Sequence, residues 1–150
     1  MATTIQFYDH AWKLITNGLN LHTAEISVRL VTSSYTFSTA HTLWDNGAND
    51  ATDPSYNEVD GGSGYVTGGE ILANMVATNS KLTPDDVVWT ALTRTFRHVI
   101  GVANGTVGGL TDPLLFRLLP DDAPADVISN GSNYSILWND TDGLFYRPED

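Results

Sequence analysis

The histidines are the side chains best suited to binding a metal ion or transferring a proton at neutral pH. They lie far apart in the sequence, at His10, His22, His41 and His98. Zinc sites usually contain closely spaced ligand pairs, and this chain has no cysteine to complete one. His98 is predicted to share the apolar face of a strand with Phe96, Ile100 and Val102, so we interpret it as a hydrogen-bonded core residue. His41 lies in a long loop and could serve a contact. We therefore expect no metal site and no cofactor.

Paired carboxylates could act as the acid and base of a glycosidase. Asp85-Asp86 and Asp121-Asp122 are adjacent pairs that follow prolines, and adjacent residues of a strand point to opposite faces. We interpret both pairs as turns. The segments 45–50 and 140–142 resemble fragments of a calcium-binding loop, but each lacks ligand positions. Binding of a divalent cation at either place stays an open alternative.

The glycine-rich stretch 61–69 has the composition of a phosphate-binding loop but not its pattern. No Lys-Ser or Lys-Thr pair follows it, and Thr67 stands where a dinucleotide motif starting at Gly62 needs glycine. Ser63 also lacks the second glycine of a nucleophile elbow, because Tyr65 occupies that position. The stretch is typical of a turn before a strand. We find no catalytic constellation and expect a protein that is not an enzyme.

Composition and charge restrict the partners. The 150 residues are 41% hydrophobic and 17% charged, which favours one globular domain over residues 1–150. The net charge is −11 and the seven basic residues are scattered, so we expect no binding to nucleic acid. No apolar run approaches the roughly 20 residues that cross a bilayer, and no signal peptide is evident, so we expect no membrane association.

Hydrophobic periodicity predicts a mainly β fold with a short N-terminal helix. A period of 3.6 predicts a helix over residues 5–16, and alternation predicts a strand over 25–32. Further strands are expected at 71–77, 86–90, 93–103, 114–119, 134–138 and 144–146. Turn-forming pairs such as Asn104-Gly105 and Asn130-Gly131 separate them. The spacing favours an antiparallel β-sandwich or jelly roll over residues 25–146.

A long excursion, residues 33–64, interrupts the strands. Loops of that length are uncommon in a compact domain unless they have a function. We expect a short helical turn near 39–44 and a short strand near 57–59. Trp44, within this loop, could anchor a partner or pin the loop to the sheet, whereas Trp12, Trp89 and Trp138 are expected in the core. Our candidates for a protein interface are Tyr8, Trp12, Tyr35, His41, Trp44 and Tyr56.

A series of short motifs resembles a family of small proteins of tailed bacteriophages, over roughly residues 7–145. Each motif is weak alone, and the order and spacing of the series carry the resemblance. The motifs are Val31-Thr32-Ser33-Ser34-Tyr35-Thr36, His41-Thr42 with Trp44-Asp45, Asn57-Glu58-Val59, Gly62-Ser63-Gly64-Tyr65 with Gly68-Gly69, Asp85-Asp86-Val87-Val88-Trp89-Thr90, Pro113-Leu114-Leu115 and Ile136-Leu137-Trp138-Asn139. The chain departs from the family in extra residues between Trp44 and Asn57, in Val66 and in the tail 146–150.

The resemblance implies a structural virion protein made in the host cytoplasm, without catalytic residues. We expect a decoration or cement protein that binds the major capsid protein on the outside of the phage head, as a homotrimer on local three-fold axes. The 33–64 excursion and the N-terminal helix are the expected contacts. Two alternatives stay open: a minor tail protein, and a carbohydrate-binding sandwich that uses Trp44.

Overall fold

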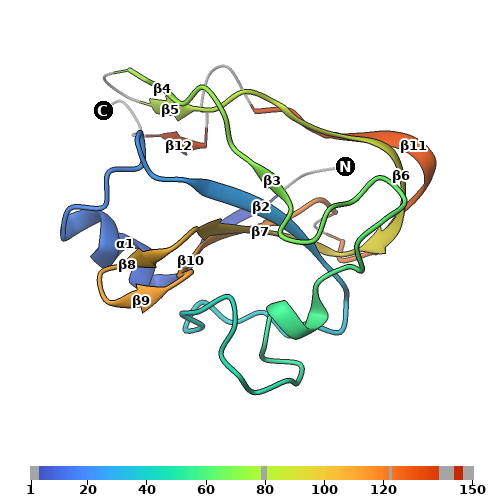
Figure 1. Ribbon diagram of the computed structural model, residues 1–150, viewed down its shortest axis with the longest axis horizontal. Helices are drawn as coiled ribbons and strands as arrows, with labels where there is room; N and C mark the ends of the chain where they lie inside the picture. Colours follow the sequence, from blue (N-terminus) through green and yellow to red (C-terminus); the bar gives the residue numbers. More distant parts are fainter. Residues whose placement is uncertain (1–3, 79–80, 122, 139–143, 147–150) are drawn as a thin grey trace.

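A computed structural model describes residues 4–78, 81–121, 123–138 and 144–146. Its centre is a five-stranded antiparallel sheet, in which every pair of neighbouring strands runs in opposite directions (Figure 1). Strand order across the sheet is β1, β10, β7, β2, β3. These strands span Thr4–Phe7 (β1), Leu114–Leu119 (β10), His98–Ala103 (β7), Ile26–Val31 (β2) and Glu70–Ile71 (β3).

One face of this sheet packs against a long two-stranded ribbon, formed by β6 (Val87–Phe96) and β11 (Val127–Ile136). Figure 1 shows the ribbon arching over the sheet. Ile26, Val28 and Leu30 alternate along β2 and meet ribbon residues in the larger core. The ribbon contributes Val87, Trp89, Leu92 and Phe96. Burial of these side chains is the main source of stability in the fold, since each contributes about 1.5–3 kcal/mol when removed from water.

The opposite face of the sheet is covered by the excursion that follows β2, which lies on the other side of the sheet from the ribbon in Figure 1. Ile100 and Val102 of β7 and Leu114 of β10 form a second, smaller core there. Tyr8, Val31 of β2, and Tyr35 and Trp44 of the excursion belong to the same core. The molecule therefore has three layers: ribbon, sheet and excursion.

The remaining elements are short. Helix α1 (Asp9–Thr16) follows β1, and a 3-10 turn, η1 (Ser55–Asn57), lies in the excursion. Strands β4 (Val76–Ala77), β5 (Lys81–Thr83) and β12 (Phe145–Tyr146) form a small sheet, and β8 (Thr106–Val107) pairs with β9 (Leu110–Thr111). Within the described residues no helix has both the length and the apolar content needed to cross a membrane.

The structure confirms the predicted fold class: a mainly β, antiparallel, sandwich-like fold with one short helix. The strands expected at 25–32 and 114–119 are β2 and β10. Both are apolar enough that their positions follow from composition and period alone.

The N-terminal prediction is wrong in its first turn. Residues 4–7 form an edge strand, and the helix begins only at Asp9. Residues 4–7 are extended because they pair with β10 in an antiparallel ladder, in which Phe7 lies opposite Phe116. Trp12, within this helix, is 53% exposed, so the expectation that Trp12 belongs to the core is also wrong.

The predicted strand over 93–103 is two strands. The chain bends at Arg97, so Phe96 ends β6 in the larger core while His98 starts β7 facing the smaller core. Phe96 and His98 therefore do not share a face, contrary to the prediction. The segment 86–90, predicted as a separate strand, is the first half of β6.

Other boundaries differ as well. The segment 71–77 contains the last residue of β3 and the whole of β4, and 134–138 overlaps only the last three residues of β11. Asn130-Gly131 is an irregularity within β11 rather than a turn between strands. No helical turn forms at 39–44, and Glu58 makes one isolated bridge to Val31 instead of a strand. Strands β5, β8 and β9 were not predicted.

Candidate functional site

A chain of polar side chains lies between the sheet and the excursion. The Tyr8 and Tyr35 hydroxyls share a hydrogen bond of 3.1 Å, and the Tyr35 hydroxyl lies 2.8 Å from His41 Nδ1. Burial lowers the pKa of His41, which favours the neutral ring. A neutral His41 with its proton on Nε2 accepts from Tyr35, so Tyr35 in turn accepts from Tyr8. This series of hydrogen bonds ties the excursion to the residue that follows β1.

Arg117, on β10, extends this cluster. Its guanidinium lies 3.8 Å from the centre of the Phe37 ring, and Nη1 is 3.5 Å from His98 Nδ1. Nη2 donates to Gln6 Oε1, whose residue lies opposite Arg117 in the β1–β10 ladder. Burial, together with the Arg117 charge, lowers the pKa of His98 to about 4. His98 is therefore neutral at pH 7.

His10 belongs to the same layer. Burial lowers its pKa, opposed by the nearby backbone carbonyls of His41 and Leu114. Three of the four histidines thus lie between the sheet and the excursion and are held neutral. Burial also raises the pKa of Tyr8 and raises that of Tyr35 to about 12. At neutral pH both phenols stay protonated and serve as hydrogen-bonding groups.

Trp44 joins the excursion to the sheet at a second point. Its indole is 5% exposed, and the Arg29 guanidinium lies 4.6 Å from the ring centre. Arg29 is held in turn by Ser27 and Asn104. Trp44 thus pins the excursion, one of the two roles considered from the sequence, and it offers no open ring face on which a sugar could stack.

The exposed tip of the excursion, residues 45–57, is stiffened by hydrogen bonds from side chains to backbone. Asp53 is fully buried and accepts from the Asn49 amide and from both the amide and the hydroxyl of Ser55. Asn57 Nδ2 donates to the carbonyls of Asp50 and Asp53. Such bonds compensate a buried carboxylate and hold a loop in one conformation.

The glycine-rich stretch 61–69 docks through Glu58. One carboxylate oxygen, Oε1, accepts from the Tyr65 hydroxyl at 2.6 Å and from the Gly68 amide at 2.7 Å. Tyr65 also accepts from the Leu30 amide of β2. The stretch forms a turn, and Tyr65 and Gly68 hold it to Glu58 and to β2.

The six interface candidates divide into two groups. Tyr8, Tyr35, His41 and Trp44 are brought together under the excursion, where they hold it to the sheet. Trp12 and Tyr56 lie apart from them on the surface, 53% and 62% exposed. Sequence reasoning missed Arg117, Phe37 and His10 as members of this cluster. Arg117 reaches it from β10, a distant element, whereas Phe37 and His10 lie two residues after Tyr35 and Tyr8 and carry no signal of their own in the sequence.

Metal binding was an open alternative at two places. Within the described residues, no group of three or more histidine, aspartate or glutamate side chains is placed to hold an ion. In the tip, Asp45 Oδ1 accepts from the Gly47 amide and Asp50 Oδ1 accepts from Thr52. The segment 140–142 lies outside the described residues.

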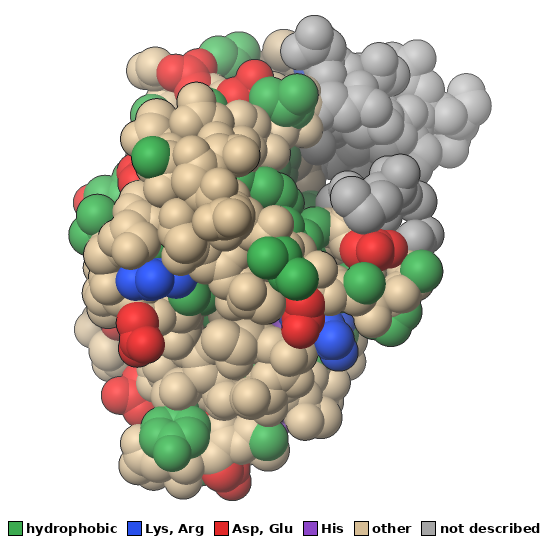
Figure 2. Space-filling view, turned by 90° about the vertical axis from the view of Figure 1, so that its right-hand side faces the viewer, with side chains coloured by type: hydrophobic (Ala, Val, Ile, Leu, Met, Phe, Trp, Pro, Cys, Tyr) green, Lys and Arg blue, Asp and Glu red, His purple; other side chains and the backbone are tan. Residues whose placement is uncertain are grey.

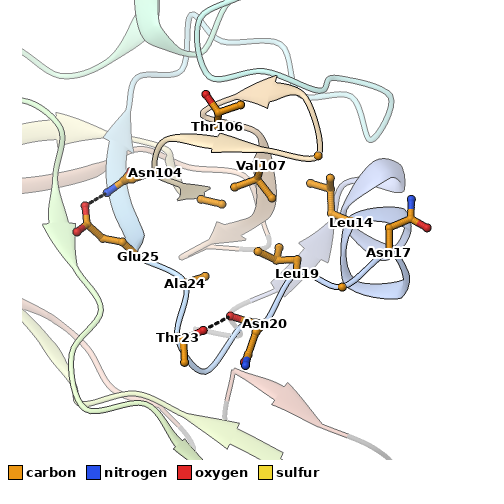
Figure 3. Close-up of a pocket in the computed structure, with 13 residues that line it drawn as sticks. Leu14, Asn17, Leu19, Asn20, Thr23, Ala24, Glu25, Asn104, Thr106 and Val107 are labelled. Carbon is orange, nitrogen blue, oxygen red and sulfur yellow. Dashed lines mark hydrogen bonds between the residues drawn. The ribbon is translucent and has the colours of Figure 1, made fainter.

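A hollow of about 470 Å³ opens between the end of α1, the following loop and the β8–β9 hairpin (Figure 3). Leu14, Leu19 and Val107 gather around it, while Asn104 donates to Glu25 Oε1 at 2.9 Å on its rim. No sequence motif predicted this hollow. Its mixed lining shows no convergent set of ionisable groups.

Figure 2 shows the side of the molecule on which the ribbon bends, with separate acidic and basic side chains spread over it. Polar uncharged groups and backbone predominate across the middle of this face. Strand β11 contains no Asp, Glu, Lys or Arg, in a chain whose net charge is −11. Such a surface is suited to contacts with protein rather than with a charged ligand.

Comparison with known proteins finds no match, whether with a family model, a curated protein or a solved structure.

Proposed function

We propose that this protein is a structural component of a tailed-phage virion that decorates the outside of the head and stabilises it. The motif series described above supports this role. The structural observation that supports it best is the excursion: a long surface segment built as a rigid layer by Asp53, Trp44 and the tyrosine–histidine chain. A loop ordered before binding loses little conformational entropy on binding.

The contact surface in this proposal is the tip of the excursion. Tyr56 projects from η1 and is 62% exposed, whereas its neighbours Pro54 and Asn57 are buried. Exposed tyrosines on rigid supports are common anchors of protein interfaces. The nearby carboxylates Asp45 and Asp50 are exposed and suit a basic patch on the major capsid protein.

Many copies would bind one particle. Three copies around each local three-fold axis is the arrangement we propose from the resemblance. A stable contact buries on the order of 1,000 Å² or more, and repetition over the shell converts modest single contacts into stabilisation of the whole head.

The test is binding of purified protein to expanded, undecorated heads, followed by sedimentation and quantification of bound protein. We expect saturable binding at a fixed number of copies per major capsid protein. Tyr56→Ala should weaken binding about tenfold or more, as loss of an interface anchor does. Val66→Ala is the matched control, because Val66 is similarly exposed, at 66%, but lies outside the tip.

A tail position is the alternative within the same particle. The same assay with purified tails separates the two, and labelling of intact particles with antibody against the protein gives an independent location. Saturable binding to tails with none to heads would replace the decoration proposal. Absence of binding to either would contradict both.

A further inference from the structure

Strand β11 is a ten-residue edge strand. It pairs with β6 on one side, and no other described strand pairs with it. Natural proteins usually protect such edges with charges, prolines or short length. The five-stranded sheet follows this practice, since its edges β1 and β3 have four and two residues. Strand β11 has neither a charge nor a proline.

Two apolar side chains mark the ends of this edge. Ile128 is 76% exposed and Leu137, directly after the strand, is 72% exposed. Both point to the solvent face of the ribbon, because their neighbours Val127, Ser129 and Ile136 are turned inward and half-buried. Exposed apolar residues so placed are the kind of feature that a protein contact covers.

We propose that β11 pairs antiparallel with β11 of a second copy of this chain, about a two-fold axis between Ser132 and Asn133. In an antiparallel pair about that axis, Ile128 of each copy lies opposite Leu137 of the other. Asn130 lies opposite Ser135, so outward side chains meet outward side chains. A two-fold contact requires such self-complementarity, and the positions of the two apolar residues satisfy it.

The distribution of charge favours a second copy of this chain as the molecule that pairs with β11. Two molecules of net charge −11 repel wherever charged faces approach. The ionisable side chain of β11 is the Tyr134 phenol, whose pKa burial raises, so the strand is neutral at pH 7. Copies can therefore approach edge to edge along β11 and form main-chain hydrogen bonds without placing carboxylates opposite one another.

The irregularities of β11 shape this contact. Its register shifts between Asn130 and Tyr134, so the regular ladders lie on either side of the axis, 127–130 of one copy against 135–138 of the other. A contact of this size is small, which predicts a weak association. It does not rest on capsid binding, and it can join copies at neighbouring three-fold axes as well as in solution.

Cysteine cross-linking tests the register, because the chain has no cysteine of its own. Ile128→Cys and Leu137→Cys are made separately in the full chain and oxidised alone and as an equimolar mixture. Opposed residues have Cα atoms about 4.5–5.5 Å apart, within the range that a disulfide spans. Cysteines at position 128 of two copies would lie about 30 Å apart along the strands.

We expect a covalent dimer in the mixture and almost none in either variant alone. Equal cross-linking in all three samples, or none in the mixture, would overturn the proposal. A second measurement needs no covalent bond: Ile128→Asp should weaken dimerisation about tenfold in sedimentation equilibrium, and Ile128→Asp with Leu137→Lys should restore it. Val76→Asp, at a 58% exposed residue of β4 in a different sheet, should leave it unchanged. Failure of the double variant to restore dimerisation would also contradict the register.

Discussion

The Tyr35 hydroxyl lies 3.1 Å from the hydroxyl of Tyr8, and this hydrogen bond joins the excursion to the residue that follows the first strand of the sheet. Both side chains are almost completely buried, at 2% and 0% exposed. The pair is therefore shielded from water, and its hydrogen bonds cannot be exchanged for bonds to solvent without opening the layer. The first prediction follows from this burial.

Tyr35→Phe should destabilise the protein by about 1–3 kcal/mol. The change removes the partner of both Tyr8 and His41 and leaves the Tyr8 hydroxyl buried without its hydrogen bond. Urea unfolding at pH 7 measures the loss. Tyr56→Phe, on an exposed side chain, is the control and should stay close to the wild type. Equal stability of the two variants would contradict the role given to Tyr35.

Stability should fall as the pH is lowered from 6.5 to 4. The pKa of His98 is about 4 in the folded chain because of its burial and of Arg117, and near 6.5 when unfolded. Between these values the unfolded state binds more protons, so the stabilisation is complete above pH 6.5 and is lost as the pH falls toward 4. The lowered pKa values of His10 and His41 act in the same direction.

The contribution of His98 is on the order of 2 kcal/mol over this range. The contribution of His98 is isolated by comparing the urea midpoints of the wild type and His98→Gln at pH 7, 6, 5 and 4. The carboxylates titrate in both proteins, so their effect cancels in the comparison. The wild type should lose more stability than the variant on acidification. His22→Gln, at an exposed turn, should keep the slope of the wild type. Parallel curves for the wild type and His98→Gln would rule out this source of pH dependence.

Adjacent glycines provide a third test. Gly68 and Gly69 both have positive φ, at 94° and 72°, so alanine is strained at either. Only Gly69 lies against other atoms: a Cβ there would collide with the backbone of Val28 in β2, whereas at Gly68 nothing lies within 4 Å. Gly68→Ala should cost about 1 kcal/mol, and Gly69→Ala should cost about 2 kcal/mol more, or prevent folding. Similar thermal stability of the two variants would contradict the close packing of this turn on β2.

The strands predicted best from the sequence are those whose own residues alternate regularly or are almost all apolar. Strand β2 alternates and β10 is apolar apart from Arg117, so period and composition located both. Residues 4–7 have a helical period as well, but pairing with β10 outweighs it. No turn-forming residue at Arg97 indicates the bend. The end of β6 and all of β7 were therefore predicted as one strand.

The polar cluster could not be found by spacing. Tyr8, His41, His98 and Arg117 come from four segments, and they meet only because β1, β10 and β7 are neighbours and the excursion folds over them. Tyr35, His41 and Trp44 were singled out because they are aromatic or titratable in a long loop. The sequence did not show which way these side chains point. In the structure they point inward and hold the excursion to the sheet.

A fourth prediction concerns the link between the stiffness of the tip and its proposed contact with the capsid. Asp53→Asn and Asp45→Asn each remove one negative charge from the tip, but only Asp53 is buried. In Asp53→Asn an amide NH₂ replaces one acceptor oxygen, so either the Asn49 amide or the Ser55 pair loses its bond. The expected cost is about 1–3 kcal/mol. Asp45→Asn keeps a side-chain oxygen for the Gly47 amide and should be nearly neutral.

The measurement has two readouts that separate structure from binding. Urea unfolding and amide exchange at Asn49 and Ser55 report the loosened tip, with faster exchange expected for Asp53→Asn alone. Binding to expanded heads should then weaken in that variant although Tyr56 is intact, because an unordered tip must be ordered on contact. If Asp53→Asn loosens the tip but binds heads as the wild type does, the tip is not the contact. If both variants weaken binding equally, charge rather than preorganisation governs it.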